Sequence, residues 1–354
     1  MKTILVTGIG GPTPRSIAKS IKAISNNYRI IGVDANPKAL GFFIPNLIDK
    51  GYLAPRMNDS SYWSFIEKLV ISESIDMAFV QPEEEVVGWG QYFEQYKKFP
   101  CPTFIPPLNL ARSLMDKSIM ADLLKGTKFI PKTIKVTQDN PCINEIEKEI
   151  GFPCWIRATK GSGGLGSLRI DNIENYKSWL FINKDIYEFT VSELLTGRHL
   201  ATQMLYYDGK YIKGASLECA EYVMANIAPS KVTGNTSFGR FINEDRILEF
   251  SNECIQYVSN KTNTPAHGIL SVDLKEDSEG HLKITEVNIR HMAYTGVMSK
   301  VGFNLIEDTI LLLKNGIGTI DHNQYYHYDK PYIFLRDVDI EPIVLNSENE
   351  FLTL

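Results

Sequence analysis

The chain of 354 residues has few cysteines and no long apolar run. Its five cysteines are an odd number without any CxxC pair, so we expect buried thiols of a reducing compartment rather than a disulfide framework or a zinc site. No apolar run approaches the ~18 residues of a membrane span. The stretch after Met1 is interrupted at Gly8 and is too short for a signal peptide. We therefore expect a cytoplasmic protein with no membrane partner.

The sequence also lacks a surplus of positive charge. Lys and Arg number 37 against 42 Asp and Glu, which gives a net charge of −5 and indicates no nucleic-acid partner. Hydrophobic residues make up 44% and charged residues 22%, the proportions of an ordinary globular protein. At ~150 residues per domain, the length predicts two or three domains that act on small molecules.

Two styles of secondary structure follow one another along the chain. Residues 1–112 alternate short apolar runs with helical patterns, which predicts an α/β domain whose parallel sheet is covered on both faces. Residues 113–320 show strands joined by glycine-containing turns together with long helices, which predicts an α+β domain. The segment 321–354 is expected to be a C-terminal tail. In detail, we expect strands at 4–6, 30–33, 77–80, 152–159, 167–171, 188–194, 201–207, 211–217, 268–275 and 282–290, and helices at 17–24, 62–72, 86–97, 243–259 and 304–314.

The hairpin GILSVDL (268–274) and TEVNIR (285–290) carries the strongest chemical signal. Because side chains alternate along a strand, Glu286, Asn288 and Arg290 share one face. A turn at residues 279–280 would place Asp273 directly opposite Glu286, and two facing carboxylates repel unless a cation lies between them. Two carboxylates and an amide oxygen suit Mg²⁺ or Mn²⁺. The alternative is an amphipathic hairpin with a solvated acidic edge.

A glycine-rich segment lies between two strand-like runs at residues 153–170. Its glycines let backbone N–H groups approach phosphate oxygens, and Arg157 and Lys160 are suitable phosphate partners. The segment is therefore interpreted as a phosphate-binding flap. A flexible hairpin without a ligand is the alternative.

The N-terminal GIGGPTPR (8–15) fits GxGxxG only at Gly8 and Gly10, since Thr13 occupies the third position. Asp34 ends the second strand, as a ribose-binding acid would in a dinucleotide-binding domain. A dehydrogenase stays open as an alternative, although a tight turn before a helix is favoured.

Taken in this order, these elements resemble the ATP-grasp superfamily over residues 1–315. The likeness is closest to carbamoyl-phosphate-synthase-large-subunit-like and pyrrolysine-pathway-type carboxylate–amine ligases. It implies a doubly wound pre-ATP-grasp domain followed by a two-lobed ATP-grasp domain. The lid lobe would span about 125–192 and the glycine flap 160–167.

The resemblance assigns roles residue by residue. It implies metal binding by Asp273, Glu286 and Asn288, and a catalytic role for Arg290. It implies ATP binding by Lys117, Arg157, Lys160, Gly161, Gly163, Gly164, Gly166, Glu193, Leu194, Leu195 and His199. The sequence departs from the family at three positions: Leu200 stands where a ribose-binding acid is usual, leaving His199 or Gln203 for that role, and Ala158 and Ile289 replace prolines.

The implied function is ATP-dependent ligation of a carboxylate and an amine through an acyl phosphate, with ATP and Mg²⁺ or Mn²⁺ as cofactors and a possible homodimer. Alternatives are a carbamoyl-phosphate-synthase-like enzyme acting on bicarbonate or carbamate, an NAD(P)-binding oxidoreductase, and a non-catalytic nucleotide-binding protein. Substrate contacts are expected among Glu84, Glu85, Tyr222, Lys231, His291 and Tyr294. For the two glutamates, a helix N-terminus is the favoured alternative reading.

Overall fold

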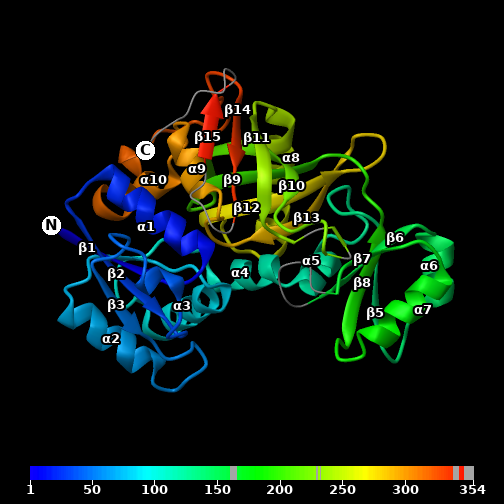
Figure 1. The fold of residues 1–354 in the computed structure, drawn as a ribbon, viewed down its shortest axis with the longest axis horizontal. Helices are drawn as coiled ribbons and strands as arrows, with labels where there is room; N and C mark the ends of the chain where they lie inside the picture. Colours follow the sequence, from blue (N-terminus) through cyan, green and yellow to red (C-terminus); the bar gives the residue numbers. More distant parts are fainter. Residues whose placement is uncertain (160–165, 229, 232, 338–342, 347–354) are drawn as a thin grey trace.

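The computed structural model describes residues 1–159, 166–228, 230–231, 233–337 and 343–346. It has three parts, an N-terminal α/β unit, a large central sheet and a small α+β lobe on the far side of that sheet (Figure 1). Among the described helices, none combines the length and the apolar character that crossing a membrane requires.

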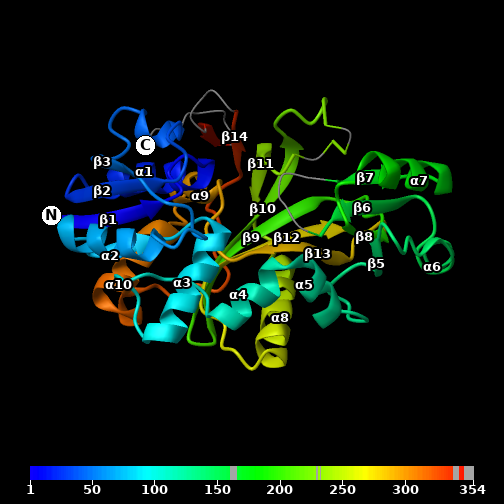
Figure 2. The same ribbon diagram turned by 90° about the horizontal axis from the view of Figure 1, so that it is seen from below.

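The N-terminal unit contains a four-stranded parallel sheet in the order β3-β2-β1-β4, as the alternation of strands and helices predicts. Its elements are β1 (Lys2–Thr7), α1 (Pro12–Ile24), β2 (Tyr28–Asp34), η1 (Leu40–Phe42), β3 (Lys50–Leu53), α2 (Tyr62–Ser72), β4 (Met77–Phe79) and α3 (Glu83–Tyr96). Alternate residues of β1 enter different cores, since Leu5 packs with the α2 and α3 side and Ile4 with α1. On the α1 side the sheet is also covered by α10 (Leu305–Asn315), from near the other end of the chain; α1 and α10 both lie above the strands in Figure 1, and Figure 2 views the sheet from the opposite side.

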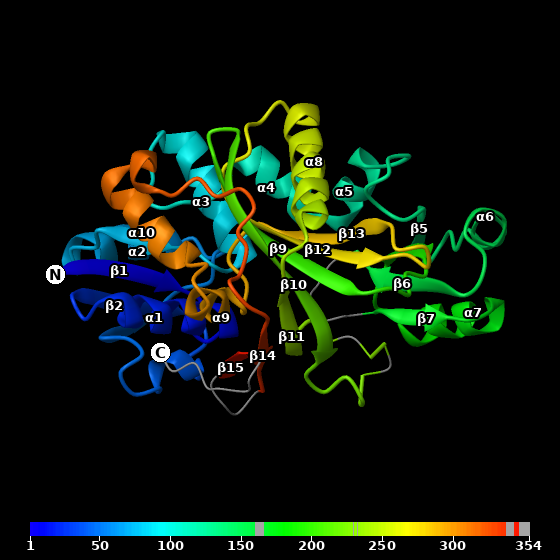
Figure 3. The same ribbon diagram turned by 90° about the horizontal axis from the view of Figure 1, so that it is seen from above.

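The central sheet is antiparallel, with seven strands in the order β13-β12-β9-β10-β11-β14-β15. Its strands are β9 (His199–Tyr207), β10 (Lys210–Tyr222), β11 (Thr236–Ile242), β12 (Gly268–Glu276), β13 (Leu282–Asn288), β14 (Tyr332–Leu335) and β15 (Ile343–Asn346). The helix α8 (Asp245–Lys261) crosses one face (Figure 3), and its buried residues belong to the same core as Val272 and Leu274. The helices α4 (Leu108–Met115), α5 (Lys117–Leu123), α9 (Thr295–Lys300) and η2 (Ile317–Thr319) complete this part.

The segment after Asp321, expected as a tail, supplies two strands of this sheet. Phe334 on β14 is fully buried and packs with Phe241 of β11. The apolar run YIFL at 332–335 therefore belongs to the core of the central part.

The small lobe has its own four-stranded antiparallel sheet, in the order β5-β8-β6-β7. Its elements are β5 (Thr133–Thr137), α6 (Ile143–Glu149), β6 (Cys154–Ala158), β7 (Leu168–Ile170), α7 (Ile173–Ile182) and β8 (Glu188–Glu193). Its buried residues, such as Ile156 and Phe189, form a separate hydrophobic core. The lobe joins the central sheet through residues 194–198, between β8 and β9.

Candidate active site

A β-bulge sets the register of the β12–β13 hairpin. Close to the turn, Glu276 pairs with Leu282 and Leu274 with Ile284, one residue away from the pairing that a turn at 279–280 predicts. If this register continued, Glu286 would pair with Val272 and face the α8 core. The extra residue Thr285 shifts the ladder, so that Asp273 lies directly opposite Glu286, as the sequence predicts.

Three polar contacts hold this carboxylate pair and the bulge beside it. The Lys117 Nζ atom, from the start of α5, lies 2.9 Å from Glu286 Oε1. The Asn288 amide donates a hydrogen bond to Asp273 Oδ2 at 3.1 Å. Arg157, on β6 of the small lobe, donates to the carbonyl oxygen of the bulged Thr285 at 2.8 Å. The bulge thus aligns the carboxylates of Asp273 and Glu286, and it also gives the small lobe a contact with the β12–β13 hairpin.

The electrostatics of the pair indicate a site for added positive charge. Burial, together with the facing Glu286, holds the pKa of Asp273 well above its ordinary value. Burial also acts to raise the pKa of Glu286, but Lys117, Arg157 and Arg290 outweigh it and bring that pKa below its ordinary value.

The donor set fits a hard divalent cation. The described residues hold no group of three or more His, Cys, Asp and Glu side chains placed for a metal ion. Two carboxylates and the oxygen of Asn288, which is 5% exposed, form a smaller set. Such a set suits Mg²⁺, which keeps several of its waters and bridges substrate phosphates.

Arg290 lies at the junction between the central sheet and the N-terminal unit. Its Nη2 atom is 3.0 Å from Glu83 Oε1 at the start of α3, and Nη1 donates to the His291 carbonyl at 3.1 Å. Among the residues that the structure describes, none accepts from its Nε–H. The guanidinium therefore keeps a donor for a further anion or carbonyl oxygen.

A cavity of about 470 Å³ opens at the hinge end of the sheet. His199, Tyr222 and Lys275 are among the residues that line it, and the rings of His199 and Tyr222 stack with centroids 5.6 Å apart. Burial, assisted by Lys275, lowers the pKa of His199 to about 4, so this imidazole is neutral at pH 7. Asp273 lies two residues from Lys275 on β12 and therefore on the same face of that strand.

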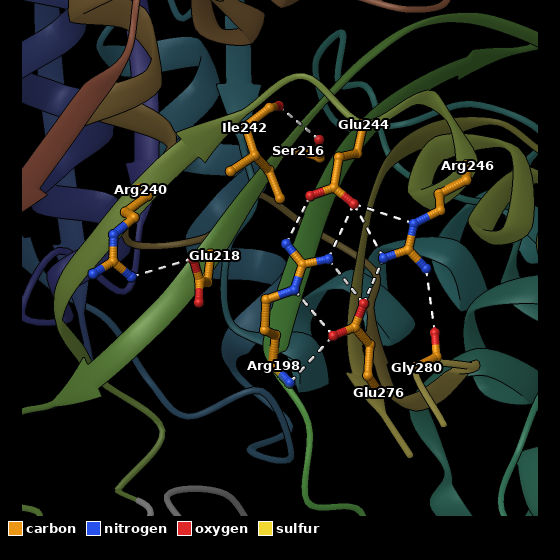
Figure 4. A network of polar contacts seen from close by, with 9 residues as sticks. All are labelled: Arg198, Ser216, Glu218, Arg240, Ile242, Glu244, Arg246, Glu276 and Gly280. Carbon is orange, nitrogen blue, oxygen red and sulfur yellow. Dashed lines mark hydrogen bonds and ion pairs between the residues drawn. The ribbon is translucent and has the colours of Figure 1, made fainter. Parts of the chain in front are cut away.

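A quartet of ion-paired side chains lies behind the hinge (Figure 4). Arg198 binds Glu244 through two contacts of 2.7 and 3.0 Å, and it binds Glu276 through contacts of 3.0 and 2.8 Å. Arg246 contacts the same two glutamates. The neighbouring Gly197 approaches so closely that an added Cβ would lie 2.6 Å from the Cβ of Glu276.

Two further side chains, those of Tyr294 and Arg336, come from the C-terminal part of the chain and lie near Asp273. Tyr294 is 4% exposed, and its hydroxyl has no hydrogen-bond partner among the described residues. Burial, reinforced by the charge of Asp273, holds the pKa of Tyr294 well above its ordinary value, while the charge of Arg336 acts on it in the opposite direction. Arg336 follows β14 and is fixed by its backbone N–H, which donates to the Ser237 carbonyl at 2.7 Å.

Other sequence candidates have different surroundings. Glu193 accepts a hydrogen bond from the Lys132 backbone at 3.0 Å. Leu195 is buried and Leu194 half-buried in the hinge. Gly166 lies at the base of the flap, where its carbonyl accepts from the Trp179 indole. The candidates Lys160, Gly161, Gly163 and Gly164 lie outside the described residues.

The remaining substrate candidates differ in exposure and in their contacts. Lys231 and Glu84 are exposed. Glu85 accepts from the Tyr62 hydroxyl at 2.9 Å, and burial raises its pKa to about 7. His291 is 3% exposed beside the Phe79 ring, and burial lowers its pKa to about 3.

The side chain of Asp34 stabilises a loop. One carboxylate oxygen accepts from the Gly10 N–H at 2.8 Å and the other from the Asn36 N–H at 2.8 Å. These bonds explain the acid at this position without a ribose.

Sequence reasoning did not single out Glu83, Arg198, Lys275 or Arg336. Glu83 begins an acidic trio, but sequence alone does not show which member meets Arg290. Lys275 had a signal, since it lies two residues after Asp273 on the same face of β12. Arg336 had none, because its approach depends on the pairing of β14 with β11.

Solved structures resemble the chain over nearly its whole length. N5-carboxyaminoimidazole synthetase from Staphylococcus aureus, complexed with ADP, aligns at a TM-score of 0.70 and 16% identity, covering 94% of this chain and 82% of that one. L-amino acid ligase from Bacillus licheniformis aligns at 0.70 and 9%, covering 96% and 82%. The biotin carboxylase domain dimer of 2-oxoglutarate carboxylase from Hydrogenobacter thermophilus, with MgADP, ADP and bicarbonate, aligns at 0.68 and 13%, covering 95% and 74%.

No protein-family model matches the sequence, and no curated protein matches it either. The chain therefore has the ATP-grasp fold, which the resemblance implied, and it shares this fold with ligases and carboxylases of low sequence identity. The oxidoreductase alternative has no support among these structures.

Proposed function

We propose that the protein is an ATP-dependent carboxylate–amine ligase of the amino-acid type. The observation that carries the proposal is the opposed pair Asp273 and Glu286, surrounded by the cationic side chains of Lys117, Arg157 and Arg290. Two facing acids indicate a site for a divalent cation, and phosphoryl transfer needs such a cation and several positive groups around the phosphates.

The nucleotide is proposed to lie between the small lobe and the central sheet. Its ribose end would occupy the cavity beside His199 and Lys275, and its phosphates would extend towards Asp273. Lys117, Arg157 and the flap, including Lys160 and its glycines, are proposed as phosphate contacts. Asp273, Glu286 and Asn288 would hold Mg²⁺, which neutralises phosphate charge when bound. The fold likeness to chains solved with ADP and MgADP supports this placement.

The proposed reaction has two steps. A carboxylate oxygen attacks the γ-phosphorus of ATP, the bond between that phosphorus and the β,γ-bridging oxygen breaks, and an acyl phosphate and ADP form. The amine of the second substrate then attacks the acyl carbon, a C–N bond forms, and the C–O bond to phosphate breaks. Of the two protons that the ammonium group loses, one leaves with phosphate and one goes to solvent. Arg290 and Arg336 would hold the carboxylate and the oxyanion that develops on it.

The first test is ADP release in the presence of Mg²⁺ with a panel of amino acids. We expect Glu286→Gln to fold normally and to lose at least about 100-fold in amino-acid-dependent ADP release, because one charge leaves the metal site. Glu279→Gln is the matched control, since it removes the same charge at the exposed tip of the same hairpin. Full turnover in Glu286→Gln would refute the metal assignment.

The same assay separates the alternatives. ADP release that requires bicarbonate and ignores amino acids would favour the carbamoyl-phosphate-synthase-like reaction, and bicarbonate is present in the Hydrogenobacter thermophilus structure. That structure is also a domain dimer, and we extend a homodimer to this chain as a proposal that light scattering can test.

A further inference from the structure

The end of β4 packs against the residues that follow the β12–β13 hairpin. The rings of Phe79 and His291 lie with their centroids 5.8 Å apart, and Glu83 contacts Arg290 at 3.0 Å. Between these two contacts the chain is extended, with Pro82 at φ −59° and ψ 131°. Met77 and Phe79 enter one core and Ala78 and Val80 the other, so by the same alternation Gln81 lies on the side of Phe79 and His291.

Two unpartnered polar atoms are buried at this junction. Gln81 is 4% exposed, and its Oε1 atom has no hydrogen-bond partner among the described residues. His291 is 3% exposed, and its Nδ1 atom is likewise unpartnered there. An unpaired buried polar group costs free energy, so the junction is short of hydrogen-bond partners that a ligand could supply.

Negative charge also gathers here, at the carboxyl ends of the parallel strands. Asp34 ends β2, and Glu83, Glu84 and Glu85 begin α3 directly after β4. The charges of Asp34 and Glu84 both contribute to the raised pKa of Glu85. A phosphorylated substrate would be repelled by this edge, whereas an ammonium group would be attracted and would bring three N–H donors.

We propose that Glu83 binds the ammonium group of the acceptor, that Gln81 Oε1 is a second acceptor for its N–H groups, and that the acceptor is a primary amine without a phosphate. This inference rests on the proposed ligase function and names the substrate class of the same site. Glu83 Oε1 lies 3.0 Å from Arg290 Nη2, so an amine held by Glu83 stands beside a carbonyl held by Arg290. This is the proximity that attack on an acyl phosphate requires.

A purely positioning role makes a different prediction. If Glu83 only orients Arg290, its loss impairs the formation of the acyl phosphate as well as its reaction with the amine. If Glu83 binds the amine, its loss leaves the first step intact. Hydroxylamine separates the two steps, because it is a small uncharged nucleophile that converts an acyl phosphate to a hydroxamate without the acceptor.

The experiment measures both steps with the full-length protein. ATP, Mg²⁺ and the best carboxylate from the amino-acid panel are supplied with hydroxylamine, and then with each amino acid as acceptor. For Glu83→Gln we expect hydroxamate formation within about twofold of wild type and a KM for the acceptor amino acid raised about 10- to 100-fold. Gln81→Met should raise the same KM by a smaller factor. Glu94→Gln is the control, because it removes an exposed charge about 16 Å further along α3.

Each outcome decides one question. Without hydroxamate from any carboxylate, the ligase function itself fails. Hydroxamate formation with an unchanged acceptor KM in Glu83→Gln overturns the inference and leaves the ligase intact. Equal losses in both steps assign Glu83 to positioning alone. Acceptance of a phosphorylated amine in preference to every amino acid in the panel would also overturn it.

Discussion

At the scale of single residues, the facing carboxylates of Asp273 and Glu286 suit the binding of a cation but lower the stability of the protein without one. Both face the same side of the hairpin, and the Lys117 Nζ atom lies 2.9 Å from Glu286 Oε1. Burial, together with the facing Glu286, raises the pKa of Asp273 to about 8, which favours the neutral form of this carboxyl group near pH 7. The fold therefore stores an unfavourable interaction that a bound cation would relieve.

Replacing Asp273 by Asn tests this conflict. We expect Asp273→Asn to raise the melting temperature of the metal-free protein by about 2–4 °C, corresponding to ~1 kcal/mol, because folding no longer requires a carboxyl group either to take up a proton or to be buried as a charge opposite Glu286. The same variant should lose the stabilisation that MgCl₂ with ADP gives the wild type, and with it turnover. Differential scanning calorimetry with and without both ligands measures both effects. A variant that is less stable than wild type without ligands would contradict the repulsion.

Residue-level prediction succeeded where strand alternation decides and failed where tertiary contacts decide. The face shared by Glu286 and Asn288 follows from their spacing. The bulge at Thr285 is not visible in the sequence, and a turn placed one residue away happened to give the same opposition of Asp273 and Glu286. Arg336 could not be found, because its position depends on the pairing of two strands about 100 residues apart.

At the scale of elements, the ion-pair quartet ties the hinge to both β12 and α8. Glu276 is 7% exposed and binds two arginines, and its backbone also accepts from the Gly197 N–H at 2.9 Å. Because Arg198 adjoins His199 in sequence and both residues line the cavity, the quartet fixes the hinge at the cavity.

Removing Arg198 should cost stability in a pH-dependent way. We expect Arg198→Met to lose about 2–3 kcal/mol of unfolding free energy at pH 7, since two glutamates lose a shared partner that is itself one-third exposed. The pKa of Glu276 is lowered to about 2, and the hydrogen bonds from Arg198 are the main cause. This contribution is complete above pH 4.5 and is lost as the pH falls towards 2, so the deficit of the variant should shrink over that range.

Urea unfolding at pH 7 and at several values down to pH 3 measures the deficit of Arg198→Met. Arg240→Met is the matched control, because Arg240 makes one 3.2 Å contact with Glu218 and is 47% exposed (Figure 4). A deficit independent of pH would show that Arg198 acts by packing alone.

At the scale of the whole molecule, the hydrophobic cores do not follow the domain boundaries that the sequence predicts. One continuous core joins Leu5 and Trp89 of the N-terminal unit to Leu270 and Ile255 of the central part. The small lobe instead keeps its own core around Phe189. The sequence predicted the change from α/β to α+β structure correctly, but it could not show that α10 covers the first sheet, because that contact joins the two ends of the chain.

The separate core predicts that the small lobe unfolds locally, independently of the rest. Phe189→Ala should destabilise residues 133–191 by about 3–5 kcal/mol, because it opens a cavity in that core alone. Leu270→Ala, in the shared core, should lower the stability of the N-terminal and central parts together by about 2–5 kcal/mol. Hydrogen exchange followed by mass spectrometry resolves both, and ADP with Mg²⁺ should slow exchange in the small lobe of the wild type. Equal acceleration throughout the chain in both variants would show a single cooperative unit, in which the hinge could not let the lobe move by itself.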